Sequence, residues 1–162
     1  MVQTGIRVGE GALGRVVALH MDPGTDLLKG LQATVESQGL RSAVILSGAG
    51  SLRQAVLRNV RSIPNAFPIT DANRVFVAKD ETMELLSLTG NVALRDDGRV
   101  VVHGHLVISS GQEDGLAYGG HLVEGSIVFS THMHQAKGLA KGRQSGMISV
   151  DETIIDQRRR PR

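Results

Sequence analysis

Four strand-like segments follow one another closely in the second half of the chain, at about residues 83–94, 99–109, 117–118 and 121–134. The turns between them are short and contain glycine: Asp96-Asp97-Gly98 favours a hairpin, and residues 111–115 form the next turn. Strands joined by such short turns pair antiparallel, because a parallel crossover needs a dozen or more residues. The second half of the chain is therefore predicted to form a mostly antiparallel sheet.

The first half contains one main helix, predicted at about residues 25–38. Its apolar stripe consists of residues at helical spacing: Leu27, Leu28, Leu31 and Val35. Gly39 is expected to end the helix as a C-terminal cap. Strands are predicted at 15–21, 43–46 and 52–60, whereas 61–80 reads as an irregular connection with a strand only at 74–78. The fold class is thus α/β (α+β), with one helix and a mostly antiparallel sheet.

The composition limits the classes of protein to consider. A chain of 162 residues is expected to form one domain, here residues 1–157, followed by a disordered basic tail at 158–162. The absence of cysteine excludes disulfides, thiolate metal sites and cysteine catalysis. No apolar run is long enough for a membrane span, and the N-terminus lacks the apolar core of a signal peptide. We therefore expect a cytoplasmic protein that does not associate with membranes.

The positive charge of the chain is concentrated at one end. The formal net charge is +2, but four of the 18 basic residues lie within the last five positions, Arg158-Arg159-Arg160-Pro161-Arg162. Without them, 14 basic residues face 16 acidic ones, a net charge of −2. Nucleic-acid-binding domains usually carry positive charge on a face of the fold. The composition therefore supports DNA binding only weakly, and only through the tail.

Histidines dominate the candidate site. In the strand at 99–109 the even positions are all apolar or glycine, so they are predicted to face the core. His103 and His105 then lie side by side on the opposite face. His121 follows Gly119-Gly120 and is expected near the start of a neighbouring strand. Three imidazoles suit a divalent transition metal and leave one coordination position open.

Other interpretations of these residues remain open. His103 and His105 could simply be solvated histidines on an exposed sheet face, since His-X-His pairs are common by chance. His132 and His134 form a rival pair with the same spacing, and His20 reads as structural or solvated. Glu84 and Glu124 are candidate proton carriers or groups that orient a histidine, although carboxylates at strand ends are more often surface groups.

Several segments, taken together, resemble one family. They are Arg15-Val-Val-Ala-Leu-His-Met-Asp-Pro-Gly-Thr-Asp-Leu-Leu, Ile45-Leu-Ser-Gly-Ala-Gly-Ser-Leu, Glu84-Leu-Leu-Ser-Leu-Thr-Gly, His103-Gly-His-Leu and Gly119-Gly-His-Leu-Val-Glu-Gly. Over about residues 13–136 this ordered set resembles a prokaryotic stand-alone PPC (plants and prokaryotes conserved) domain. The resemblance implies a homotrimer and a broad fold shared with acetolactate decarboxylase, which holds zinc with three histidines. By that similarity His103, His105 and His121 match the histidines of prokaryotic members.

The resemblance also implies possible DNA binding, because plant members follow an AT-hook and prokaryotic members are often labelled DNA-binding. The AT-hook core Arg-Gly-Arg-Pro is absent here, where the tail has Arg159-Arg160-Pro161-Arg162. The first hypothesis is therefore a trimeric, metal-binding PPC-domain protein of undetermined cellular role. The alternatives are a metal-dependent enzyme, lyase or hydrolase in type, acting on a small oxo-acid ligand, and a DNA-associated regulator that uses the arginine tail.

Overall fold

The computed structural model describes residues 5, 16–65, 68–129 and 154–156. Their elements in chain order are β1 (Val16–Val17), α1 (Leu27–Ser37), β2 (Ser42–Ile45), β3 (Gly50–Val60), a 3-10 turn (Asp71–Asn73), β4 (Arg74–Lys79), β5 (Met83–Leu94), β6 (Val100–Ser110), β7 (Ala117–Leu122), β8 (Ile127–Val128) and β9 (Ile154–Asp156). One helix accompanies a sheet whose pairings within these residues are all antiparallel. The predicted α+β class is confirmed.

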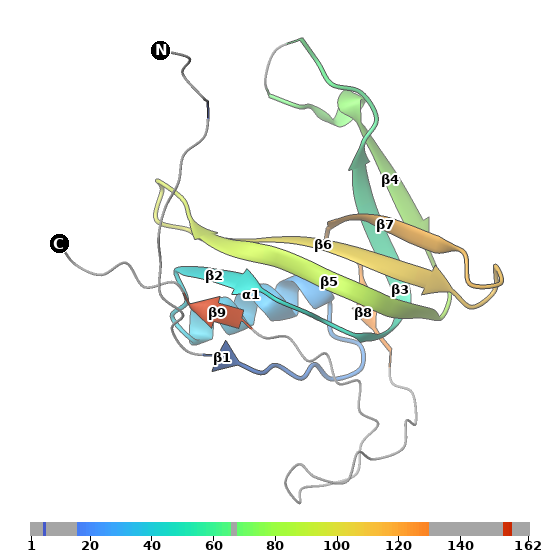
Figure 1. Ribbon diagram of the computed structural model, residues 1–162, viewed down its shortest axis with the longest axis horizontal. Helices are drawn as coiled ribbons and strands as arrows, with labels where there is room; N and C mark the ends of the chain where they lie inside the picture. The colour runs from blue at the N-terminus through green and yellow to red at the C-terminus, as the bar shows by residue number, and fades with distance from the viewer. Residues whose placement is uncertain (1–4, 6–15, 66–67, 130–153, 157–162) are drawn as a thin grey trace, which may run out of the picture.

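The strands are arranged in the order β1-β9-β2-β5-β6-β7-β3-β4. The first residues of β3 also pair with the first residues of β5, with Gly50 opposite Leu85. Consequently β3, β5, β6 and β7 form a closed ring of strands, because β5 pairs with β6, β6 with β7 and β7 with β3. Figure 1 shows β3 and β4 rising steeply across the direction of the long β5 and β6 strands.

The helix forms where the sequence predicts it, between two local signals. The Asp26 side chain caps its first turn by accepting a hydrogen bond from the Lys29 backbone N–H at 3.0 Å. Gly39 follows the helix with φ +63°, a left-handed conformation that glycine adopts without steric cost. Leu27, Leu31 and Val35 are completely buried. The helix is fixed to β6 by Gln32, whose Nε2 donates to the Val100 carbonyl at 2.8 Å.

The alternation in β6 confirms the prediction from strand parity. Val102, Leu106 and Ile108 are buried in the core, whereas the intervening residues 101, 103, 105 and 107 are exposed. Gly104, between the two histidines, faces the Leu122 and Leu88 side chains on the core side. The histidine pair therefore contributes little to the core.

The structure corrects two predicted strands. Of the strand predicted at 15–21, which the structure describes from residue 16 on, only Val16–Val17 is found paired, with β9. The strand predicted at 121–134 is interrupted in its described part. Residues 121–122 are the end of β7, which begins at 117, and a turn at Glu124-Gly125, where Gly125 has φ +99°, separates them from the short β8. His132, His134 and the tail at 158–162 lie outside the described residues. No helix within the described residues is long and apolar enough to cross a membrane.

Candidate metal centre

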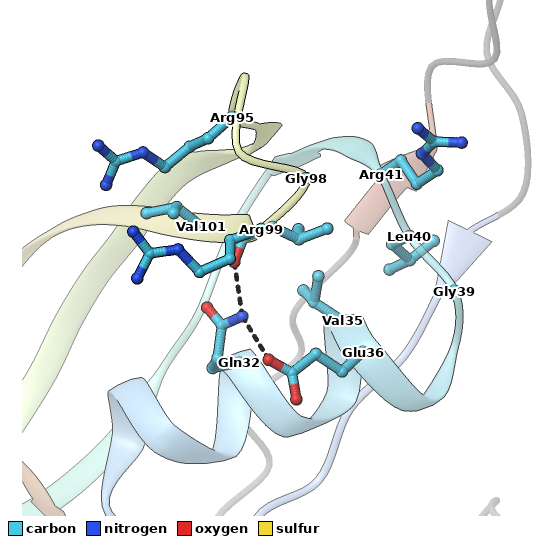
Figure 2. A pocket seen from close by; sticks show the side chains of 11 residues that line it. Gln32, Val35, Glu36, Gly39, Leu40, Arg41, Arg95, Gly98, Arg99 and Val101 are labelled. Atoms are coloured by element: carbon cyan, nitrogen blue, oxygen red, sulfur yellow. Dashed lines mark hydrogen bonds between the residues drawn. The ribbon is translucent and has the colours of Figure 1, made fainter.

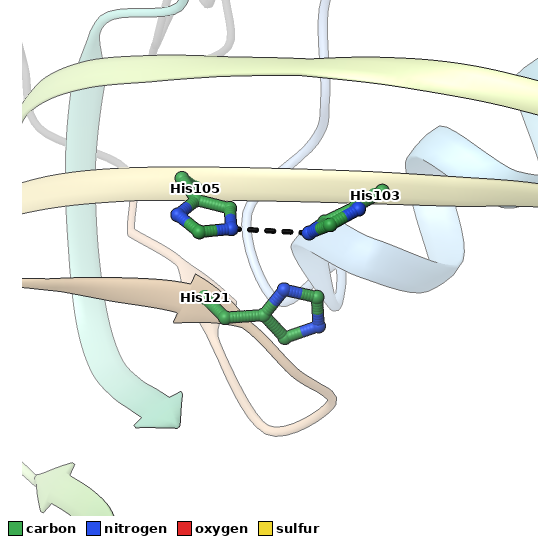
Figure 3. Close-up of side chains that lie close together, drawn as sticks. All are labelled: His103, His105 and His121. Atoms are coloured by element: carbon green, nitrogen blue, oxygen red, sulfur yellow. Dashed lines mark hydrogen bonds between the residues drawn. The ribbon is translucent and has the colours of Figure 1, made fainter. Parts of the chain in front are cut away.

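His103, His105 and His121 come together on the exposed face of β6 and β7. The register places His105 directly opposite His121, and His103 lies two residues along β6. The three ring centroids are 4.8 to 5.3 Å apart. One nitrogen from each ring can be chosen so that all three lie within 4.8 Å of one another. Figure 3 shows the His121 ring reaching from β7 towards the pair on β6.

The donor set and its spacing fit a transition metal. The Nε2 atoms of His103 and His105 are 3.1 Å apart. Two nitrogens bound to a tetrahedral zinc at about 2.0–2.1 Å lie about 3.3 Å from each other, so this pair already has a chelating separation. Since the chosen nitrogens all lie within 4.8 Å of one another, the remaining approach is at most about 1.5 Å, which a small change of the imidazole torsions can supply.

Two glycines allow the strands to approach closely at the site. A Cβ at Gly120, next to His121, would lie 2.6 Å from the Asn59 Oδ1 of β3. The same Asn59 donates through Nδ2 to the Gly119 carbonyl at 2.9 Å. A Cβ at Gly90 of β5 would lie 2.1 Å from the His103 backbone oxygen. The glycines thus bring β3 and β5 up against the two strands that carry the histidines.

The electrostatic surroundings keep His121 neutral. Burial lowers its pKa from the ordinary 6.5 to about 4, and the positive charges of Arg58, of the two neighbouring histidines and of Arg74 act in the same direction. A neutral imidazole offers a nitrogen lone pair, which a protonated one does not. At neutral pH His121 therefore needs to lose no proton before it can bind a metal.

Neither candidate carboxylate lies within the group of described side chains that could together hold a metal. Glu84 is exposed on β5 and pairs in register with Ser109, four residues along β6 from His105 and so about 13 Å away at ~3.3 Å per residue. Glu124 is exposed at the turn after β7, and its carboxylate forms an ion pair with Lys29 at 3.0 Å. Within the described chain, neither glutamate therefore belongs to the histidine cluster.

The histidines do not line the cavities at either end of the sheet. One cavity of about 520 Å³ lies between the end of α1 and the β5–β6 turn, bordered by Arg41, Arg95 and Arg99 (Figure 2). Figure 2 shows Arg95 and Arg99 on one side of the view and Arg41 on the other, and Arg99 is paired with Asp97 at 2.7 Å. A second cavity of about 340 Å³ lies beside Glu84 and Ser109. The histidine cluster instead occupies an open sheet face.

Arg58 is a residue of this site that the sequence did not indicate. It lies on β3, and its Cα partner across the β3–β7 pairing is His121. Residues directly opposite in antiparallel strands point to the same face of the sheet. No local pattern signals this neighbour, since the pairing joins residues that are far apart in the chain.

The chain matches the Plants and Prokaryotes Conserved (PCC) domain, the PPC family named above, over residues 8–134. It belongs to this family.

Solved structures of similar fold carry two kinds of description. A metal-containing protein from Archaeoglobus fulgidus is 25% identical, with a TM-score of 0.66 over 94% of this chain and 86% of that one. A plant- and prokaryote-conserved (PPC) protein from Pyrococcus horikoshii is also 25% identical, with a TM-score of 0.63 over 94% and 84%. A candidate DNA-binding protein from Bacteroides thetaiotaomicron is 18% identical, with a TM-score of 0.58 over 91% and 83%, which shows the fold alone.

Among curated sequences the chain is similar to part of a longer protein. It is 32% identical over 141 residues to the bifunctional protein GlmU of Synechococcus sp. (strain JA-3-3Ab). The match covers 81% of this chain but 20% of that protein, so the chain spans about a fifth of the relative's length. The similarity therefore concerns one segment of that protein.

Proposed function

We propose that this PCC-domain protein binds a divalent transition metal, zinc in the first instance, through His103, His105 and His121, and that it acts as a cytoplasmic homotrimer. The convergence of the three imidazoles on one face of β6 and β7 carries the proposal. Imidazole nitrogens suit zinc, copper, iron and nickel. The description of the Archaeoglobus fulgidus relative as metal-containing supports the same conclusion.

Metal analysis of the purified protein tests the proposal. We expect one zinc per chain after zinc loading and removal of the excess, and less than a tenth of that in the double variant His103→Ala/His105→Ala. His20→Ala is the matched control, because His20 is exposed and lies outside the cluster. Stoichiometric zinc in the double variant would show that the metal is held elsewhere.

The trimer is supported by the face that carries the histidines. Val101 and Val107, on the same side of β6 as the histidine pair, are 37% and 38% exposed. Apolar side chains beside an open polar cluster favour burial against a second copy of the chain, which would also enclose the site. Light scattering should give three times the mass of one chain, and Val107→Lys should shift the mass towards that of a monomer. A wild-type protein with the mass of a single chain would refute the trimer.

An enzymatic role is the second candidate, favoured by the number of ligands. Three protein ligands leave one position open, as in catalytic zinc sites, and a metal there supplies Lewis-acid polarisation or an activated water. A small oxo-acid would be the substrate of a lyase or hydrolase. A proton-carrying role for Glu84 or Glu124 would require a neighbouring subunit, because neither carboxylate joins the cluster of its own chain. Turnover of 2-oxo and 2-hydroxy-3-oxo acids by zinc-loaded protein, absent in His121→Ala, is the test.

DNA association through the arginine tail is the remaining candidate. It is supported by the tail sequence and by two structural neighbours described as candidate DNA-binding proteins. A trimer would present three tails, and multivalency raises a weak affinity. Fluorescence anisotropy with an A/T-rich duplex near physiological salt should show binding that is lost when residues 158–162 are deleted. Equal DNA binding by the truncated protein would show that the tail does not carry the interaction.

A further inference from the structure

The face that carries the histidines continues across β3. The pairings place four side chains in one cross-strand row, one on each strand from β5 through β6 and β7 to β3: Thr89, His105, His121 and Arg58. Directly opposite residues in antiparallel strands have Cβ atoms about 4.5–5.5 Å apart. Arg58 therefore lies beside His121 in this row, and its charge is among the causes that lower the pKa of His121.

Arg58 has no carboxylate partner of its own among the described residues. It takes part in none of the ion pairs found there. Asp71, the acid whose charge acts on it, is held by Arg74 at 2.9 Å. Burial and the charge of Arg74 lower the pKa of Arg58, but a guanidinium stays protonated in proteins. A half-buried positive charge without a direct ion-pair partner among the described residues thus lies beside the site.

A metal at the cluster would add to the positive charge around Arg58. Three neutral imidazoles leave the full charge of a divalent ion, and Arg58 adds a further positive charge. The close metal-binding group among the described residues includes no carboxylate that could offset them. Positive charges that lie close together repel one another, and a bound anion offsets that repulsion. An anionic ligand is therefore favoured at this site.

We propose that the site binds a small organic carboxylate carrying an adjacent oxygen, a 2-oxo or 2-hydroxy acid, with one oxygen on the metal and the carboxylate on Arg58. This inference rests on the proposed metal site and names the class of ligand that the metal would take. The guanidinium presents paired N–H donors that match a carboxylate bidentately. Phe76 continues the row as the partner of Arg58 and is 53% exposed. Its ring offers apolar surface to a short carbon chain, which favours an organic acid over inorganic phosphate.

Cobalt(II) in place of zinc gives a readout that is independent of activity, since its visible absorption changes when a ligand binds. Pyruvate titrated into the cobalt-loaded protein should change this spectrum, whereas methyl pyruvate, which lacks the charge, should not. Arg58→Gln should weaken pyruvate binding about 10- to 100-fold, as expected for one charge-assisted hydrogen-bonding group. Arg58→Lys keeps the positive charge but not the paired N–H donors, so its affinity for pyruvate should lie between those of the wild type and Arg58→Gln. Arg53→Gln is the matched control, because Arg53 is an exposed arginine earlier in the same strand.

The metal content of each variant separates the two proposals. Arg58→Gln should bind cobalt at least as tightly as the wild type, because it removes a like charge, and it should therefore stay folded and loaded. Two outcomes would overturn the role of Arg58 while leaving the metal site intact. In the first, cobalt-loaded Arg58→Gln binds pyruvate as tightly as the wild type. In the second, the cobalt-loaded wild type does not bind pyruvate at all. Failure of the wild type to bind cobalt would instead refute the metal site. Tighter binding of inorganic phosphate than of pyruvate would overturn the choice of an organic carboxylate.

Discussion

Gly90 of β5 packs against the β6 backbone that carries His103 and His105, and Gly90→Ala should therefore disturb both the sheet and the site. Gly90 pairs with Gly104, the residue between His103 and His105. An ideal Cβ at position 90 would lie 2.1 Å from the His103 carbonyl oxygen and 2.9 Å from the Gly104 Cα. Both are backbone atoms, so no side-chain rotation can relieve the overlap. β6 would have to move away from β5 by about 1 Å to restore van der Waals contact.

We expect Gly90→Ala to lower the free energy of unfolding by about 3 kcal/mol, the upper part of the range for overpacked positions. The entropic benefit of replacing glycine, about 0.4–1 kcal/mol, is too small to offset this. For a domain of this size each kcal/mol corresponds to about 2–4 °C, so Tm should fall by about 6–12 °C. Zinc content after loading should fall as well, because the displaced segment includes the backbone of His103.

Gly104→Ala is the matched control. A Cβ there would meet side-chain atoms, Leu122 Cδ2 at 3.3 Å and Leu88 Cδ1 at 3.6 Å, which can shift slightly. The expected loss is about 1 kcal/mol. Thermal and urea unfolding of both variants, monitored by circular dichroism, measures the difference. A Tm of Gly90→Ala equal to the wild type, or above that of Gly104→Ala, would refute the reasoning from backbone contact.

Three further predictions follow from the site and the core. The pKa of His121 is lowered to about 4 from 6.5, so between these values the unfolded chain binds a proton that the native chain does not. Metal-free protein should therefore lose stability as pH falls from about 6.5 to about 4, and urea unfolding should show a shallower loss in His121→Gln. Asp26→Ala removes the helix cap and the 2.7 Å hydrogen bond that Asp26 accepts from the Gly125 N–H, and should cost about 1–2 kcal/mol in the same assay, with Asp26→Asn costing less. Leu31→Ala, at a fully buried position, should cost about 2–5 kcal/mol, which a loss below 1 kcal/mol would contradict.

The parts of the fold that could be predicted are those with a local pattern. The apolar stripe and the glycine after it predicted the helix, and the structure places α1 at Leu27–Ser37. Alternation in β6 correctly assigned its core face, and therefore the side on which His103 and His105 lie. The predicted bounds of β5 match the structure. In each case the residues of one element carry the whole signal.

The errors concern contacts between distant segments. The sequence predicts a break at Gly119-Gly120, but β7 continues through it, and the glycines there allow Asn59 of β3 to approach. The length of β1 depends on its pairing with β9, from the other end of the chain. Arg58 could not be found from the sequence for the same reason. The proximity of the three histidines agrees with the predicted site, whereas their role as ligands and the kinship with acetolactate decarboxylase stay predictions.

The closed ring of strands has a consequence for the order in which the site assembles during folding. The three histidines belong to two strands joined by a short turn, and such a hairpin forms within about 1–10 μs. Arg58 reaches them only when β3 closes the ring against β7, a contact of large sequence separation that forms slowly. The three imidazoles would therefore meet early and Arg58 late. If the proposed metal and acid sites are correct, a folding chain would be able to capture a metal before it could bind the small acid.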